Sequence, residues 1–117
     1  MKTASWSGYR GAGRVGISIG HPRWLPDVPR YPPLMPRRSM LRLPYDRYLE
    51  LYTEQLAKLD PERVVADLTA LAAGHEPVLL CYERPPFAPD NWCHRRMVAD
   101  WLEKRLGLVV PELLAIE

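Results

Sequence analysis

The fold is decided by Val78-Leu-Leu-Cys-Tyr-Glu83 and, after a looping interval, by Trp92-Cys-His-Arg-Arg96. The first run is apolar until its closing glutamate, which is typical of a central parallel strand that is covered on both faces. The second run opens a helix that is expected to end at Gly107, with Asp90 or Asn91 as its N-terminal cap. The stretch therefore predicts a buried strand, a proline-containing connection and a helix.

Two more helices are predicted upstream of this stretch. Apolar residues recur at three- and four-residue steps between Tyr45 and Leu59, which defines one buried helix face. Asp60-Pro61-Glu62 is a typical helix start, because it offers an N-capping aspartate, a proline in the first turn and an acid near the positive end of the helix dipole. Gly74 is expected just beyond the end of that second helix.

Short strands complete the pattern. Residues 3–6 and 14–19 favour strands near the N-terminus, and Leu108-Val-Val110 favours a last strand. Strands that alternate with helices are typical of a mostly parallel sheet. The sequence therefore predicts an α/β fold in which this sheet is sandwiched between helices. A chain of 117 residues corresponds to one domain, residues 1–117.

The segment from Pro22 to Pro44 contains seven prolines in 23 residues. Each proline removes an amide donor and fixes φ, so neither a helix interior nor a central strand tolerates this density. We expect a long irregular segment that packs on the domain, because apolar residues are interleaved with the prolines. These apolar residues are Trp24, Leu25, Tyr31, Leu34 and Met35.

Positive charge is concentrated in the first part of the chain. Residues 1–47 hold nine lysines and arginines against two acids, a net charge of +7, whereas residues 48–117 hold seven against twelve, a net charge of −5. Such a basic half can bind phosphates or nucleic acid, or it can be a solvated surface facing the acidic helices of the same domain. A module that binds nucleic acid or an acidic protein is therefore one functional hypothesis, although the sequence carries no known nucleic-acid-binding motif.

No apolar run approaches the roughly 18 residues that a membrane span needs. The N-terminal residues lack the apolar region of a signal peptide. We therefore expect a cytoplasmic protein without a membrane partner, in which both cysteines are reduced thiols.

Candidate catalytic residues gather where the predicted central strand meets the next helix. Cys81 and Glu83 lie at the end of the strand, which is where ligand crevices form in open α/β sheets. Cys93 and His94 fall in the first turn of the helix, where free amide donors and the helix dipole favour anions and thiolates. We predict all four as catalytic residues, with Glu83 as a general base or as the group that orients His94.

Arg95, Arg96 and Tyr48 are the predicted ligand-binding residues, because the arginines can hold a carboxylate or phosphate and the phenol can face the crevice.

Each candidate also has a structural interpretation. The cysteines and Tyr48 can be core residues, His94 can be hydrogen-bonded in the interior, and Glu83 can simply pair with Arg95. Their convergence at one junction favours a pocket for a small ligand that is anionic or nucleotide-like. The residues identify neither a cofactor nor a reaction.

A zinc-stabilised structural module is a further hypothesis. Cys81, Cys93, His94 and His21 carry suitable ligand atoms, but their spacing lacks the Cys-x2-Cys pairs that zinc sites usually show. Adjacent residues on a helix also point about 100° apart, which makes joint ligation by Cys93 and His94 awkward. We therefore predict no metal ligands.

The two motifs, Leu79-Leu-Cys-Tyr-Glu83 and Cys93-His-Arg-Arg96, resemble the signature of the family numbered 488 among the domains of unknown function. The chain is most similar to the short members of that family. These members share an Ile-Ser-Ile segment, here Ile17-Ser-Ile19, and a Tyr-x-Pro-Leu-x-Pro stretch, here Tyr31-Pro-Pro-Leu-Met-Pro36. They also share a helix with spaced tyrosines, so the resemblance spans nearly the whole chain.

The resemblance implies an α/β sandwich and no established reaction. The site residues that it implies are Cys81, Glu83, Cys93, His94 and Arg95. One departure from the family pattern is the connection between Arg84 and Trp92, which is rich in proline and longer than in many members.

Overall fold

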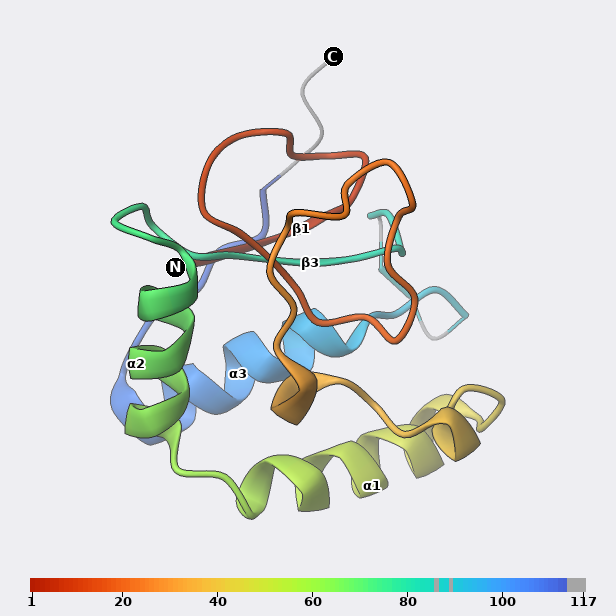
Figure 1. Cartoon of the computed structure of the whole chain (residues 1–117). Coiled ribbons are helices and arrows are strands. Elements are labelled where there is room, and N and C mark those ends of the chain that lie inside the picture. Colours follow the sequence, from red (N-terminus) through yellow and green to blue (C-terminus); the bar gives the residue numbers. More distant parts are fainter. Residues whose placement is uncertain (86, 89, 114–117) are drawn as a thin grey trace.

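The structure is a computed structural model, and it describes residues 1–85, 87–88 and 90–113. The elements follow the order β1 (Lys2–Ser5), β2 (Arg14–Gly16), η1 (Pro32–Leu34), η2 (Arg38–Met40), α1 (Tyr45–Ala57), α2 (Pro61–Leu71), β3 (Val78–Cys81) and α3 (His94–Leu106). Figure 1 shows the strands and helices in one compact body. None of the helices in the described part of the chain is long and apolar enough to cross a bilayer.

The sheet has three parallel strands in the order β1-β3-β2. The central strand is β3, and all four of its residues are buried, as its continuous apolar sequence predicts. Ser5 pairs with Cys81 and Val15 pairs with Leu79, so the carboxyl ends of the strands meet at one edge. The α/β class and the parallel sheet are confirmed.

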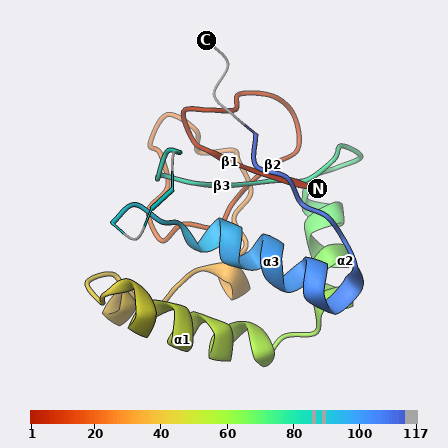
Figure 2. The ribbon, with the colours of Figure 1, turned by 180° about the vertical axis from the view of Figure 1, so that it is seen from behind.

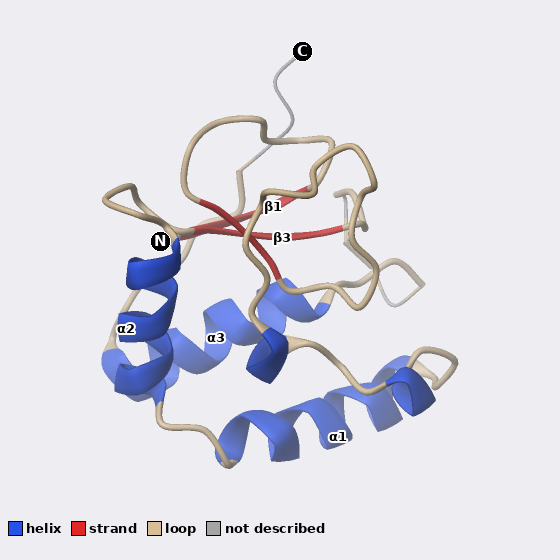
Figure 3. Cartoon of the chain, viewed as in Figure 1, coloured by secondary structure: helices blue, strands red, loops and turns tan. Residues whose placement is uncertain are grey.

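The two faces of the sheet are covered in different ways. On one face, Val15 and Leu79 pack with side chains of α1, α2 and α3. On the other face, Ala4 and Leu80 form a second cluster whose described members come from strands and loops, including Val28. Figures 1, 2 and 3 show the helices below the strands and the loops above them. Among the described residues, the expected layer of α-helices is therefore found on one face only, because the proline-rich segment that reaches the second face cannot form an α-helix.

The helix ends follow local chemistry, with one difference from expectation. The Asp60 side chain accepts a hydrogen bond from the Glu62 amide at 3.1 Å and so caps α2. Gly107 ends α3 with a φ of 67°, a conformation in which glycine avoids the Cβ clash. The cap of α3 is Cys93 rather than Asp90 or Asn91, and its side chain makes no capping hydrogen bond.

The segment after α3 does not form the expected strand at residues 108–110. Pairing with β1 comes slightly later, where the Thr3 amide donates to the Pro111 carbonyl at 2.9 Å and the Leu113 amide donates to the Thr3 carbonyl at 2.7 Å. Glu112 forms an isolated parallel bridge with Thr3 between these bonds. This late return of the chain carries Glu112 to the edge of the sheet.

The proline-rich segment contacts α1 through its backbone. Tyr52 donates its hydroxyl to the Leu34 carbonyl at 2.6 Å, and Gln55 donates to the Met35 carbonyl at 2.7 Å. Proline-rich chain leaves carbonyls without regular partners, so side chains of α1 satisfy them. These bonds hold the chain around residues 34 and 35 against α1.

Candidate functional site

The two cysteines meet at the carboxyl edge of the sheet. Cys81 is the last residue of β3, Cys93 caps α3, and their sulfur atoms form a disulfide bond. Neither cysteine is free, so the expectation of two reduced thiols is wrong for this structure. The sequence could not predict the bond, because it depends on how the connection between the two elements folds back.

His94 is buried beside this bond in one defined tautomer. Its Nε2 donates to the Ile17 carbonyl at 2.7 Å, and its ring packs edge-on against Tyr52. A carbonyl only accepts, so Nε2 carries the proton and Nδ1 keeps a lone pair. Nδ1 lies 3.8 Å from the Sγ of Cys93. Burial, opposed by the bond to Ile17 and aided by the charge of Arg95, lowers the pKa of His94 to about 4, so the ring is neutral at pH 7.

Arg95 is fully buried and bound within the protein. Its Nε and Nη2 donate to the two carboxylate oxygens of Glu112 at 2.9 and 2.8 Å. Its Nη1 lies 3.0 Å from the Sγ of Cys81, and its guanidinium sits 5.0 Å from the ring centroid of Phe87. Glu112 could not be identified as this partner from the sequence, because an acid after the last predicted strand carries no local signal of such a contact. This paired geometry leaves Arg95 turned inward, away from solvent.

A cleft of about 530 Å³ opens beside this buried cluster. Glu83, Tyr48, Cys93 and His94 line it, so three of the four predicted catalytic residues share one cavity with a predicted binding residue. Glu83 is exposed and Tyr48 is buried. Burial, with a further contribution from the negative charge of Glu83, raises the pKa of Tyr48 well above its ordinary value, so its phenol keeps its proton at neutral pH.

Two cleft segments were not predicted as site residues. The segment Ser18-Ile19-Gly20 follows β2, and Arg38 begins η2 above the cleft. Ser18 to Gly20 lie where the carboxyl ends of parallel strands form crevices, so the boundary of β2 is the signal that could have identified them. Arg38 could not be selected from sequence, because seven other arginines share the first 47 residues.

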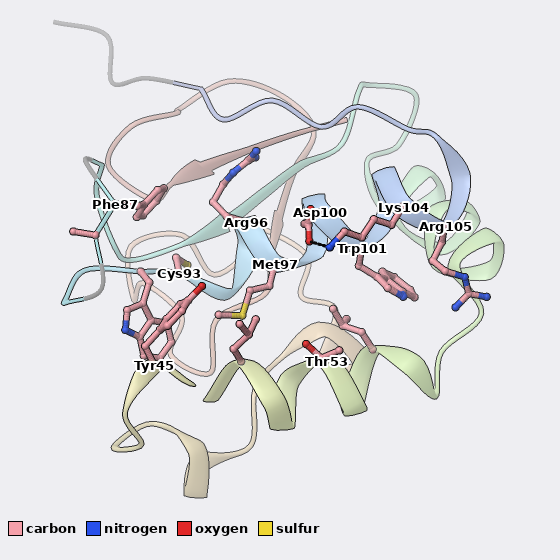
Figure 4. A pocket seen from close by; sticks show the side chains of 14 residues that line it. Tyr45, Thr53, Phe87, Cys93, Arg96, Met97, Asp100, Trp101, Lys104 and Arg105 are labelled. Carbon is pink, nitrogen blue, oxygen red and sulfur yellow. Dashed lines mark hydrogen bonds and ion pairs between the residues drawn. The ribbon is translucent and has the colours of Figure 1, made fainter. Parts of the chain in front are cut away.

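A second cavity of about 730 Å³ runs between α1 and α3. Figure 4 shows Cys93 at the end near Tyr45, and Lys104 and Arg105 at the other end. Trp92 and Cys93 line this groove as well as the cleft. Cys93 therefore borders both cavities, whereas Cys81 is completely buried.

The remaining candidates have structural contacts. Arg96 lines the groove, and its Nη1 donates to the Thr3 hydroxyl and to the Val110 carbonyl, each at 2.8 Å. His21 has a ring nitrogen 2.6 Å from the Leu25 carbonyl, and its ring packs against Trp6. These contacts tie Arg96 to the end of the chain and His21 to the loop-covered face.

Ligand atoms of Cys81, Cys93 and His94 lie within 4.8 Å of one another, which is a spacing that a metal ion can bridge. The two sulfurs are bonded to each other here, so they offer no thiolates. Metal binding at this cluster would therefore require prior reduction.

A family model described as DUF488-N3a, the active DUF488-N3 subclade, matches residues 18–106. The match covers more than half of the chain and includes every residue predicted for the site. Searches of the curated proteins and of the solved structures found no match.

Proposed function

The chain belongs to the DUF488 family, in the subclade DUF488-N3a, and we propose that it is an enzyme that binds a small anionic, nucleotide-like ligand in the cleft beside Glu83. The observation that carries this proposal is the gathering of Glu83, Tyr48, Cys93 and His94 around one cavity at the carboxyl edge of the sheet. The description of the subclade as active favours a catalytic role over binding alone.

Glu83 is the best candidate for the acid–base group. Its carboxylate is exposed at the end of the central strand, and it is close enough to Tyr48 to raise the pKa of that phenol. A carboxylate that accepts a proton next to a phenol that keeps one is a suitable pair for proton transfer and for orienting a substrate hydroxyl or amide. His94 is neutral and its Nε2 is held by Ile17, so we assign it to positioning Cys93 rather than to general acid catalysis.

Arg38 is the best candidate for holding the negative group of the ligand. It lines the cleft and is exposed, so its guanidinium is accessible to an incoming anion. Arg95 was predicted for this role, but its charge is compensated by Glu112 and its side chain is fully buried. A guanidinium forms two parallel hydrogen bonds to a carboxylate or phosphate, which suits Arg38 to either group.

The size and walls of the cleft fit a nucleotide-like ligand. Its volume of about 530 Å³ lies within the range of small-molecule sites. Tyr82, Tyr48 and Trp92 line it, and aromatic rings can stack on a planar base. Phosphate recognition by Arg38 and stacking on these rings together define the proposed ligand class.

The test is a titration of isotope-labelled protein with adenosine monophosphate, followed by nuclear magnetic resonance, with adenosine as the matched ligand that lacks the phosphate. We expect amide shifts at residues 18–20, 38 and 83, and weaker binding of adenosine. Arg38→Glu should weaken binding of the monophosphate by at least about tenfold, or ~1.4 kcal/mol. Arg37→Glu is the matched control, since Arg37 is exposed but does not line the cleft.

If Arg38→Glu and Arg37→Glu lose the same affinity for adenosine monophosphate, the ligand binds a diffuse basic surface of the kind that binds nucleic acid and not a defined cleft site. If adenosine and its monophosphate bind with equal affinity, the cleft does not recognise the phosphate, and the proposed anionic ligand is wrong. Amide shifts confined to the groove between α1 and α3 would contradict the cleft itself.

A further inference from the structure

The atoms around the bonded sulfurs match the reduced form of the pair better than the bonded form. A disulfide sulfur carries neither a proton nor a charge, so it is only a weak hydrogen-bond acceptor. Yet Arg95 Nη1 points at Cys81 Sγ from 3.0 Å, and His94 Nδ1 lies 3.8 Å from Cys93 Sγ. Reduction of the bond between the sulfurs strengthens the first contact and allows the second to become a hydrogen bond.

On the Cys81 side, the donor is held in place before any thiolate forms. Two hydrogen bonds to Glu112 fix the guanidinium of Arg95, and its third donating nitrogen faces the sulfur. A thiolate at this position accepts a charge-assisted hydrogen bond from Arg95. Glu112 compensates part of the positive charge, so the stabilisation comes mainly from the directed N–H donor.

On the Cys93 side, the contact lacks a proton while the bond is intact. The ring proton of His94 is on Nε2, which donates to Ile17, so Nδ1 has a free lone pair. A reduced Cys93 can donate its S–H to that lone pair. Reduction therefore adds a hydrogen bond on this side too, without moving the histidine ring.

The two sulfurs differ in access. Cys93 is 3% exposed and lines both the cleft and the groove, whereas Cys81 is 0% exposed and lines neither. We propose that Cys81 and Cys93 are a redox-active pair that undergoes thiol–disulfide exchange with a small thiol, with Cys93 as the sulfur attacked and Cys81 as the leaving thiolate. Stabilisation of the dithiol form makes a disulfide easier to reduce, which distinguishes a redox-active disulfide from a structural one.

The exchange balances in two steps. A thiolate of the small thiol attacks Cys93 Sγ, the bond between the two cysteines breaks, and its electron pair stays on Cys81 Sγ beside Arg95. A second thiolate then attacks the sulfur of the bound small thiol, forming an external disulfide and releasing the Cys93 thiolate. The two protons lost by the small thiols are taken up by the cysteines or by solvent, so two thiols are oxidised and one disulfide is reduced.

This inference does not rest on the proposed ligand cleft. It would stand if Arg38 and Glu83 bound nothing, and it could fail while the cleft still bound an anion. The test is therefore made without any cleft ligand.

The first measurement is a redox titration of the native protein in glutathione buffers. Exchange is stopped with acid, the chain is then unfolded, and a maleimide-linked polymer that shifts each free thiol on a gel is added, because both cysteines are buried in the folded protein. We expect both thiols to appear together over one reversible transition while the protein stays folded by circular dichroism. Thiols that form only when denaturant is present during the incubation with glutathione would overturn the proposal and leave a structural disulfide. Thiols that stay free in the most oxidising buffer would overturn it as well.

The second measurement assigns the roles of the two sulfurs. Cys81→Ser and Cys93→Ser are matched variants, each incubated with glutathione disulfide and weighed by mass spectrometry. Cys81→Ser should gain one glutathione on Cys93, and Cys93→Ser should react at least tenfold more slowly. Equal rates, or the opposite order, would contradict the assignment. Stoichiometric zinc that is retained by the reduced wild-type protein and blocks labelling would identify the cluster as a metal site instead.

Discussion

The buried cluster of Cys81, His94 and Arg95 and the open cleft that contains Glu83 and Arg38 lie side by side but use polar groups in opposite ways. In the buried cluster, the N–H donors of Arg95 and His94 already have acceptors within the protein. Arg95 binds Glu112 and Cys81, and His94 binds Ile17. In the cleft, Glu83 and Arg38 are exposed to solvent. Residues that are close together in the sequence at this junction can therefore serve two purposes, some in a structural network and others on a binding surface.

The strongest test of this comparison is the removal of Arg95. Arg95→Met removes the charged partner of the largely buried carboxylate of Glu112, which among the described residues keeps only the hydrogen bond from the Thr3 hydroxyl. We therefore expect a loss of about 3–5 kcal/mol in the free energy of unfolding, measured by denaturant titration. Arg63→Met is the control, because its pair with Asp67 is on the surface, where water and salt screen it, and its loss should change stability little. Similar losses in the two variants would contradict the buried network.

The pH dependence of stability tests the buried histidine. The pKa of His94 falls from its ordinary value of 6.5 to about 4 in the folded protein, chiefly through burial. The unfolded chain therefore takes up a proton first as the pH falls, and stability present above pH 6.5 is lost as the pH approaches 4. The loss should be about 3 kcal/mol.

His94→Asn is the matched variant for that measurement, because asparagine offers an amide donor but does not titrate. Denaturant midpoints are compared with wild type from pH 8 to pH 4. The slope between pH 6.5 and 4 should be shallower in the variant, and an unchanged slope would show that His94 does not carry the effect.

Two tyrosines on α1 should differ in the same way, with a smaller effect on stability. Tyr52→Phe removes the hydroxyl that bonds the Leu34 carbonyl, so we expect a loss of about 1–2 kcal/mol in the free energy of unfolding. Tyr48→Phe removes a hydroxyl that lines the cleft, and it should change stability less while weakening binding of adenosine monophosphate. Thermal or denaturant unfolding measures the first effect and the resonance titration measures the second. A larger stability loss for Tyr48→Phe would place that hydroxyl in the structural network.

The smallest expected effect is at Glu83. Glu83→Gln keeps the side-chain shape at an exposed position, so its free energy of unfolding should stay within about 0.5 kcal/mol of wild type. The same unfolding titration checks this. A loss above about 1 kcal/mol would assign Glu83 to the fold rather than to the cleft.

Sequence periodicity predicted the three α-helices and the central strand. The apolar run before Glu83 became the central strand, and Asp60 capped α2 as its motif predicts. The wrong details depended on long-range partners. Residues 108–110 lack a strand because the pairing with β1 is made around Glu112. In the part of the chain that the structure describes, loops and not helices cover the second face of the sheet.

Periodicity, capping and proline content are local properties, so the α/β class, the central strand and the strand–helix junction could be predicted from them. Which of the candidate residues face solvent depends on the packing of the whole fold. The bond between Cys81 and Cys93 and the pairing of Arg95 with Glu112 join segments that are separate along the chain. Such pairings depend on how the strand, the helix and the end of the chain pack together, and no local pattern encodes that packing.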